Sequence, residues 1–243
     1  MKNWKDWLKN IENEFGDGAG GWLRKSHIRR TVHPNDGGRN IYDTVKDHEY
    51  FNLAADPSVG KPDKRFPKKN GSHSKTAVQS VYHITKLQKH LNVNPKDLDT
   101  VTDIGAGYGH LCYTFRRCGF MGEYNLIDFG VMHKMQSYFL SQTGFEGTFR
   151  KISQLNEIEK KPKNLLFASY SINEMPMDER KRIEPFYRDY KYIMIVYKSN
   201  ADFGVDNRSY FNTLLTELQI SHNTKIVDDQ LCKNDRILLA SKK

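Results

Sequence analysis

The sequence has few cysteines and no long apolar run. Its 243 residues include only 3 cysteines, and the spacing of Cys112, Cys118 and Cys232 suits neither a metal site nor a set of structural disulfides. No run approaches the roughly 18 consecutive apolar residues that a transmembrane helix needs. The first residues are amphipathic and charged and lack the apolar core of a signal peptide, so we expect a cytoplasmic protein without membrane association.

Apolar residues are also scarce, at 37% of the chain, whereas aromatic residues make up 12%. Disordered chains rarely carry so many aromatic side chains, so this composition predicts a folded protein with a polar surface. Positive charge is in excess, with 38 Lys and Arg against 29 Asp and Glu and a net charge of +9. The segment 24–75 alone holds 12 basic and 6 acidic residues. It favours an anionic partner such as nucleic acid, phosphate or a nucleotide-linked sugar, or else a solvated surface.

The spacing of apolar residues divides the chain into two parts. Residues 4–15 carry an apolar stripe at three- and four-residue steps, which predicts a helix. From residue 24 to 75 no period holds and proline and glycine recur, which is typical of a long irregular segment such as a lid. We therefore expect an N-terminal helical and basic extension over residues 1–75 and a second domain over residues 76–243.

Candidate helices and strands alternate in the second part. Predicted helices cover 76–91, 111–117, 131–140, 178–187 and 210–218, and predicted strands cover 100–104, 124–128, 148–152, 165–170 and 192–197. This alternation predicts an α/β fold with a mainly parallel sheet covered by helices. Two final strands, near 225–228 and 237–241, are separated by too few residues for a helical crossover, so we expect a seven-stranded sheet that ends in an antiparallel hairpin.

A glycine-rich loop follows the first of these strands. Residues Val101–His110 read VTDIGAGYGH, between a strand and a helix. Glycine allows positive φ and a close approach to the backbone, and ligands of open α/β sheets bind at the carboxyl ends of the strands. The glycines stand at the first, third and fifth positions, whereas a dinucleotide fingerprint has them at the first, third and sixth. The next strand ends in Asp128, whose carboxylate can accept both hydroxyls of a ribose.

This loop, with Asp103 before it and Asp128 after the next strand, resembles motif I and its follower in class I S-adenosyl-L-methionine-dependent methyltransferases. The resemblance implies a Rossmann-like methyltransferase fold and S-adenosyl-L-methionine as cofactor. It implies that Asp103 steers the amino group of the cofactor, Asp128 holds the ribose and Phe129 flanks the adenine. The other residues that we expect at the cofactor are Gly105, Ala106, Gly107, Tyr108, Gly109 and Ser169.

A narrower resemblance spans roughly residues 56–198. The segments 104–111, 124–128, 138–140 and 169–175 are similar to the proposed sugar O-methyltransferases of bacteria and their phages. This resemblance implies a transferase that methylates a hydroxyl of a sugar or glycan-type acceptor. The basic segment suggests that the acceptor carries negative charge.

A hydroxyl acceptor has to lose its proton as the methyl group moves, and a general base contributes to that step. Glu174, Tyr170 and His110 are the candidates near the predicted mouth of the site, although Glu174 and His110 also suit a purely structural place at a helix start. The segment after the fourth strand lacks the Asn/Asp-Pro-Pro-aromatic motif common among amino-methylating nucleic-acid enzymes. Methylation of a base nitrogen is therefore disfavoured.

Alternative functions stay open. Ribose 2′-O-methyltransferases that act on RNA use a Lys-Asp-Lys-Glu tetrad, and Lys198 follows the fifth strand while Lys86 or Lys89 lies in the helix before the glycine loop. The aspartate of the tetrad has no counterpart. A second alternative is a non-catalytic S-adenosyl-L-methionine-binding or scaffold protein. Paired acidic residues hold a divalent metal in several sugar methyltransferases, but we predict no metal site at the pair Asp228-Asp229.

Overall fold

The computed structural model describes residues 4–32, 38–68, 71–145, 148–152, 155–200, 204–229, 231, 232 and 234–243. The chain forms two compact units. The N-terminal unit consists of Met1–Thr85, Gly107–Phe120 and Phe129–Glu146, and the sheet unit consists of Lys86–Ala106, Met121–Asp128 and Gly147–Lys243. Each unit is assembled from separated stretches of the chain, and the extension expected over residues 1–75 remains a prediction. Of that extension, residues 1–3, 33–37, 69 and 70 lie outside the described residues.

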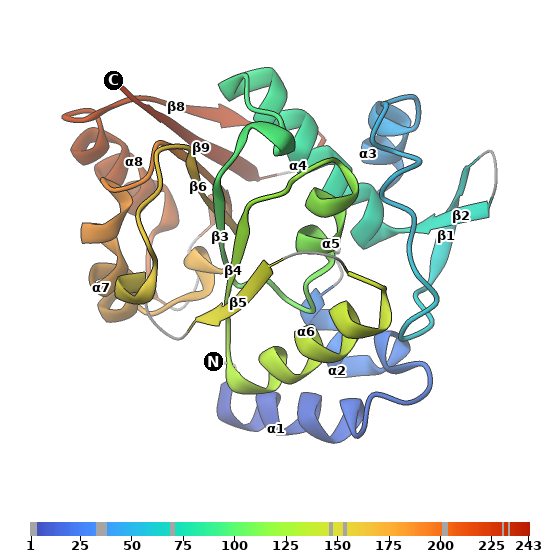
Figure 1. Cartoon of the computed structure of the whole chain (residues 1–243). Helices are drawn as coiled ribbons and strands as arrows, with labels where there is room; N and C mark the ends of the chain where they lie inside the picture. Colours follow the sequence, from blue (N-terminus) through green and yellow to red (C-terminus); the bar gives the residue numbers. More distant parts are fainter. Residues whose placement is uncertain are drawn as a thin grey trace. The chain divides into compact units, whose positions relative to one another are not determined.

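The sheet unit contains a seven-stranded sheet with the strand order β5-β4-β3-β6-β7-β9-β8 (Figure 1). The strands are β3 (Thr100–Ile104), β4 (Glu123–Ile127), β5 (Thr148–Ile152), β6 (Asn164–Ser169), β7 (Tyr192–Lys198), β8 (His222–Asp228) and β9 (Asp235–Lys242). The first five strands of that order pair in parallel, and β9 pairs antiparallel with both β7 and β8. This confirms the predicted fold class, including the C-terminal hairpin.

The central strands are almost entirely buried, since every residue of β3 and all of β6 except the half-exposed Ser169 lie in the interior. Burial on both faces explains the apolar run Leu165–Ala168 of β6, whereas β3 also buries Thr100, Thr102 and Asp103. Helices α7 (Met177–Tyr187) and α8 (Asn207–Leu218) contribute to one core with β6, β7 and β9. In that core the ring of Phe211 stacks on Tyr197 with 3.8 Å between the ring centroids. The short helices of this unit are η2 (Pro95–Asp97), η3 (Leu155–Glu157) and η4 (Ile172–Glu174).

The N-terminal unit is mainly helical. Its elements are α1 (Trp4–Phe15), η1 (Trp22–Arg24), α2 (Ser26–Val32), α3 (Gly38–Val45), β1 (Lys64–Lys68), β2 (Gly71–Ser74), α5 (His110–Arg117) and α6 (Gly130–Gln142), together with most of α4 (Lys75–Leu91). The segment expected to be irregular therefore contains two helices and a hairpin. With 7 and 8 residues, α2 and α3 are too short for an apolar repeat to be visible. Among the described residues, no helix combines the length and apolar character needed to cross a membrane.

The buried side chain of Arg180 binds both the connection between β6 and α7 and the first residue of α8. Its side chain is fully buried, and its guanidinium donates to Asn173 O at 2.7 Å, to Met175 O at 2.9 Å and to Asn207 Oδ1 at 2.8 Å. The guanidinium also lies 4.7 Å from the ring centroid of Tyr210. A charge removed from water is tolerated only where its donors are satisfied, so this geometry holds the backbone on both sides of Glu174.

We expect Arg180→Lys to lower the free energy of unfolding by about 2–4 kcal/mol, because one ammonium cannot replace the planar fork of donors. Urea denaturation measures this loss. Arg182→Lys is the matched control on the same helix, since Arg182 is exposed and pairs with the nearby Glu179 on that helix. Its change should stay within about 0.5 kcal/mol. Equal denaturation midpoints for both variants would contradict the structural role of Arg180.

Candidate active site

The glycine loop begins at the carboxyl end of β3 with an exposed glycine. Gly105 has a φ of +76°, and its N–H donates to Ile127 O of the neighbouring strand at 2.8 Å. A Cβ atom on Gly105 would lie 2.3 Å from the Cβ atom of Ser171, whose hydroxyl in turn donates to Ile104 O. Only glycine fits here, for reasons of both conformation and space. The exposed backbone of Gly105 and of the half-exposed Ala106 is accessible to a ligand.

The second half of the loop belongs to the N-terminal unit. Gly107 and Gly109 have φ values of +57° and +90°, and Gly109 directly precedes α5. The side-chain amide of Gln136 donates to Gly107 O at 2.8 Å. Tyr108 is buried, and its ring packs edge-on against Trp22 and Phe139. The side chain of Tyr108 therefore anchors this half of the loop in an aromatic core.

Two carboxylates make the sheet-unit part of the site negative. Asp103 is buried in β3 and accepts a hydrogen bond from the Tyr124 hydroxyl at 2.9 Å. Burial raises the pKa of Asp103 to about 7, and the negative charge of Asp128 adds to the rise against the lowering effect of the Tyr124 hydrogen bond. Asp128 itself is half-exposed directly after β4. A negative environment fits the ammonium and sulfonium groups of S-adenosyl-L-methionine and opposes the phosphates of a dinucleotide.

Phe129 follows Asp128 in the chain and belongs to the N-terminal unit. Its side chain is 51% exposed, although it is one of the larger apolar residues of the chain. An exposed aromatic ring suits stacking on a planar heterocycle, which is the role that the resemblance to methyltransferases implies for Phe129.

The residues expected at the acceptor lie after β6, in the sheet unit. Ser169 ends β6 in register with Val196 of β7 and is half-exposed. Tyr170 follows it, and its hydroxyl donates to Asp235 Oδ2 at 2.6 Å. Glu174 ends η4 and is half-buried, between the two backbone carbonyls that Arg180 binds. The sequence led us to expect Ser169, Tyr170 and Glu174 at this edge, but it gave no sign of Asp235, which lies 65 positions from Tyr170.

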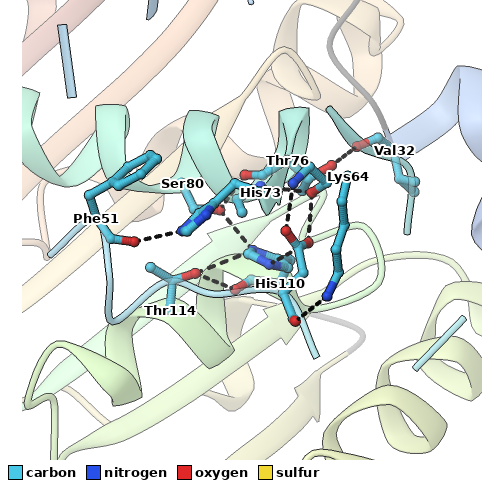
Figure 2. Close-up of polar contacts among 11 residues, drawn as sticks. Val32, Phe51, Lys64, His73, Thr76, Ser80, His110 and Thr114 are labelled. Atoms are coloured by element: carbon cyan, nitrogen blue, oxygen red, sulfur yellow. Dashed lines mark hydrogen bonds and ion pairs between the residues drawn. The ribbon is translucent and has the colours of Figure 1, made fainter. Parts of the chain in front are cut away.

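His110 lies in a buried polar network of the N-terminal unit (Figure 2). Its Nδ1 atom is 3.1 Å from Ser80 Oγ and 3.2 Å from Thr114 Oγ1, and its Nε2 atom is 3.5 Å from Asp56 Oδ1. Asp56 also accepts from the hydroxyl and the N–H of Ser74 at 2.7 and 2.6 Å. Burial acts to raise the pKa of Asp56, but His110 and Ser74 outweigh it, so this pKa lies below its ordinary value. Both ring nitrogens thus face protein oxygens.

The acidic pair considered as a metal site is engaged within the hairpin. Asp228 Oδ1 lies 2.9 Å from Arg236 Nε across the β8–β9 ladder. Asp229 Oδ1 accepts the N–H of Leu231 at 3.0 Å. In the part of the chain that the structure describes, no three His, Cys, Asp or Glu side chains gather in a way that could hold a metal ion.

Comparisons with known proteins bear on the fold. No family model matches the chain, and no curated protein matches it. A proposed S-adenosyl-L-methionine-dependent methyltransferase from Methanococcus maripaludis superposes with a TM-score of 0.51 at 15% identity, over 66% of this chain and 84% of that one. The PH0226 protein of Pyrococcus horikoshii OT3 gives a TM-score of 0.50 at 12% identity, over 69% and 92% of the two chains. At such identities the likeness shows the fold alone, which is the Rossmann-like α/β fold of class I methyltransferases.

Proposed function

We propose that the protein is an S-adenosyl-L-methionine-dependent O-methyltransferase that methylates a hydroxyl of a sugar or glycan-type acceptor. The observation that carries this proposal is the loop after β3, in which Gly105, Gly107 and Gly109 all adopt positive φ. It stands in a Rossmann-like sheet whose next strand is followed by Asp128. When bound, the cofactor supplies an electrophilic methyl group on a sulfonium.

The charge of the sheet unit supports this cofactor. Asp103 and Asp128 are close enough that the charge of one raises the pKa of the other, so a cationic ligand is favoured there. Asp128 would hold the ribose hydroxyls, and Asp103 would neutralise the amino group directly or through the backbone. Gly105 and Ala106 would let the ligand approach the main chain, and Phe129 would stack on the adenine. Ser169, the last residue of β6, would contact the cofactor at the same edge of the sheet.

The acceptor would lie at the ends of β6 and β7, beside Tyr170 and Glu174. These two residues would orient the acceptor hydroxyl and receive its proton, while His110 would support the loop from within the N-terminal unit. Holding the hydroxyl in line with the methyl group is the larger contribution to rate, and proton removal adds about 10²–10⁴-fold. The excess of basic residues over 24–75 would draw in a negatively charged acceptor.

A second candidate is ribose 2′-O-methylation of RNA. Lys198 ends β7, and the half-buried Lys86 lies near enough to Asp229 for their charges to interact. These are the two lysines of a four-residue pattern, and its aspartate has no counterpart after β6, where Ser171 and Asn173 stand. A non-catalytic S-adenosyl-L-methionine-binding protein would not need the residues at the ends of β6 and β7.

Asp128→Ala should weaken binding of S-adenosylhomocysteine at least about tenfold, because two charge-assisted hydrogen bonds to the ribose would be lost. Isothermal titration calorimetry measures the affinity. Asp228→Ala is the matched control, since it removes a carboxylate of the same unit that lies at the sheet hairpin and pairs with Arg236. Equal affinities for both variants, or no binding by the wild type, would contradict the assignment of S-adenosyl-L-methionine as cofactor.

Affinity for S-adenosylhomocysteine should fall as the pH drops below about 7, by up to about tenfold per unit. The reason is that the bound amino group favours ionised Asp103, whose pKa in the unliganded protein is about 7, so a proton must leave on binding. Above that pH the carboxyl is already ionised and the dependence disappears. Asp103→Asn should bind more weakly at high pH and show no such dependence. A pH-independent wild type would place the amino group away from Asp103.

Tritiated S-adenosyl-L-methionine incubated with a bacterial glycan fraction and, separately, with total RNA distinguishes the acceptor classes. We expect wild type to label the glycan fraction and Asp128→Ala to label neither. Labelled RNA, with binding that weakens steeply as salt rises, would favour the second candidate. If wild type binds S-adenosylhomocysteine but labels neither fraction, the non-catalytic alternative gains support.

A further inference from the structure

A tyrosine at the end of β6 has an unusual backbone conformation. Tyr170 has a φ of +63°, in a region that bulky residues rarely occupy. Two contacts hold it there: its N–H donates to Val196 O at 2.8 Å, and its hydroxyl donates to Asp235 Oδ2 at 2.6 Å. Backbone strain of this kind persists only where the surroundings enforce it, and it is concentrated at functional sites.

The partner of this tyrosine is built into the sheet. Asp235 is buried at the start of β9 and stands directly opposite Lys198, the last residue of β7. The ammonium of Lys198 lies 6.0 Å from the ring centroid of Tyr170. The backbone of Lys198 is itself bound by the Asn173 side chain at 3.3 Å. Three neighbouring strands therefore bring a phenol, a carboxylate and an ammonium to the same edge, where the acceptor is proposed to lie.

The charges around Tyr170 keep its hydroxyl protonated. Burial raises its pKa most, and the negative charge of Asp235 raises it further, with contributions from Cys232 and Asp229. Lys198 is the positive group beside the ring, and Lys86 is coupled to Asp229. A phenol in these surroundings does not ionise near neutral pH. It can take up a proton only if it releases its own to Asp235 at the same time.

We propose that Tyr170 and Asp235 form a proton relay for the acceptor hydroxyl, an inference that rests on the proposed O-methyltransferase function. As the acceptor oxygen forms its bond to the methyl carbon, the sulfur–methyl bond of the donor breaks and the thioether leaves. The acceptor proton passes to Tyr170 Oη, and the Tyr170 proton passes to Asp235 Oδ2. Tyr170 is the group that touches the acceptor, and Asp235 acts through it. Lys198 stabilises the negative charge as it shifts from the Asp235 carboxylate toward the acceptor oxygen.

The relay also narrows the acceptor class. An amine acceptor attacks through a neutral lone pair, and a carboxylate acceptor is already ionised, so neither needs a proton removed as its bond to the methyl carbon forms. An alcohol does, because its own pKa is far above neutral. The Tyr170–Asp235 pair thus favours a sugar or ribose hydroxyl over these other acceptors.

The test compares initial rates of tritiated methyl transfer to the bacterial glycan fraction at saturating S-adenosyl-L-methionine. Tyr170→Phe and Asp235→Asn should each lower the rate at least about 100-fold with unchanged affinity for S-adenosylhomocysteine. The acid limb of the wild-type pH profile should vanish in Asp235→Asn, and Asp235→Glu should recover part of the rate. Ultraviolet titration should show one tyrosine ionising at lower pH in Asp235→Asn and not in the double variant with Tyr170→Phe.

Tyr190→Phe is the matched control, because it removes another buried phenol hydrogen bond of the same unit, 3.0 Å long, to Thr102. Its rate should stay within about threefold of wild type. If Tyr170→Phe behaves like Tyr190→Phe, or if Glu174→Gln alone abolishes transfer, the relay is wrong while the proposed function stands. If wild type labels neither the glycan nor the RNA fraction, the proposed function fails and the relay fails with it.

Discussion

The in-register parallel pairing of β3 with β4 and β6 is the constraint on which the site depends. Ile104 lies opposite Ile127 on one side and Ala168 on the other, so the three strands end in one row. Backbone hydrogen bonding within this ladder is strong and directional, and each strand is buried. The residues that follow these strands therefore emerge at one edge, whatever their own chemistry. A shift of one position would point every side chain of a strand to the opposite face.

Two buried polar clusters, one in each unit, hold backbone and side chains in place through hydrogen bonds. Arg180 binds two carbonyls and one side-chain amide and so fixes the backbone around Glu174. In the N-terminal unit, His110 and Asp56 form a pair in which His110 Nδ1 faces two hydroxyls and Asp56 accepts from the hydroxyl and the N–H of Ser74. Unpaired, such groups would cost several kcal/mol each. Their pairing explains why Arg180, His110 and Asp56 can lie in the interior of the protein.

Asp103 shows how stability and binding oppose one another in this fold. Because the pKa of Asp103 is about 7 in the folded protein, ionising this carboxyl lowers the free energy of unfolding, and the loss reaches its full size above pH 7. A cationic ligand would relieve it. The residue is thus less favourable for folding than an amide would be, which is the kind of local conflict that functional sites retain.

Much of the fold follows from local pattern. The mainly apolar strands β6 and β7, the three glycines after Ile104 and the short connection before β9 are strong local signals, so the sheet, the loop and the C-terminal hairpin could be predicted. The segment 24–75 could not, because α2 and α3 are too short to show a repeat.

The candidate site likewise contains some residues that the sequence can predict and others that it cannot. Residues next to a strand end, such as Asp128 and Tyr170, can be recognised because the parallel sheet brings strand ends together. Partners far along the chain cannot, since no local rule links Tyr170 to Asp235 or His110 to Asp56. Those pairs arise only when strand register and helix packing bring distant residues within hydrogen-bonding distance, and burial then strengthens their interaction. The spacing of residues along the chain is thus sufficient to predict the sheet and its glycine loop. The protonation state of each candidate residue, by contrast, depends on neighbours that only the tertiary structure brings close.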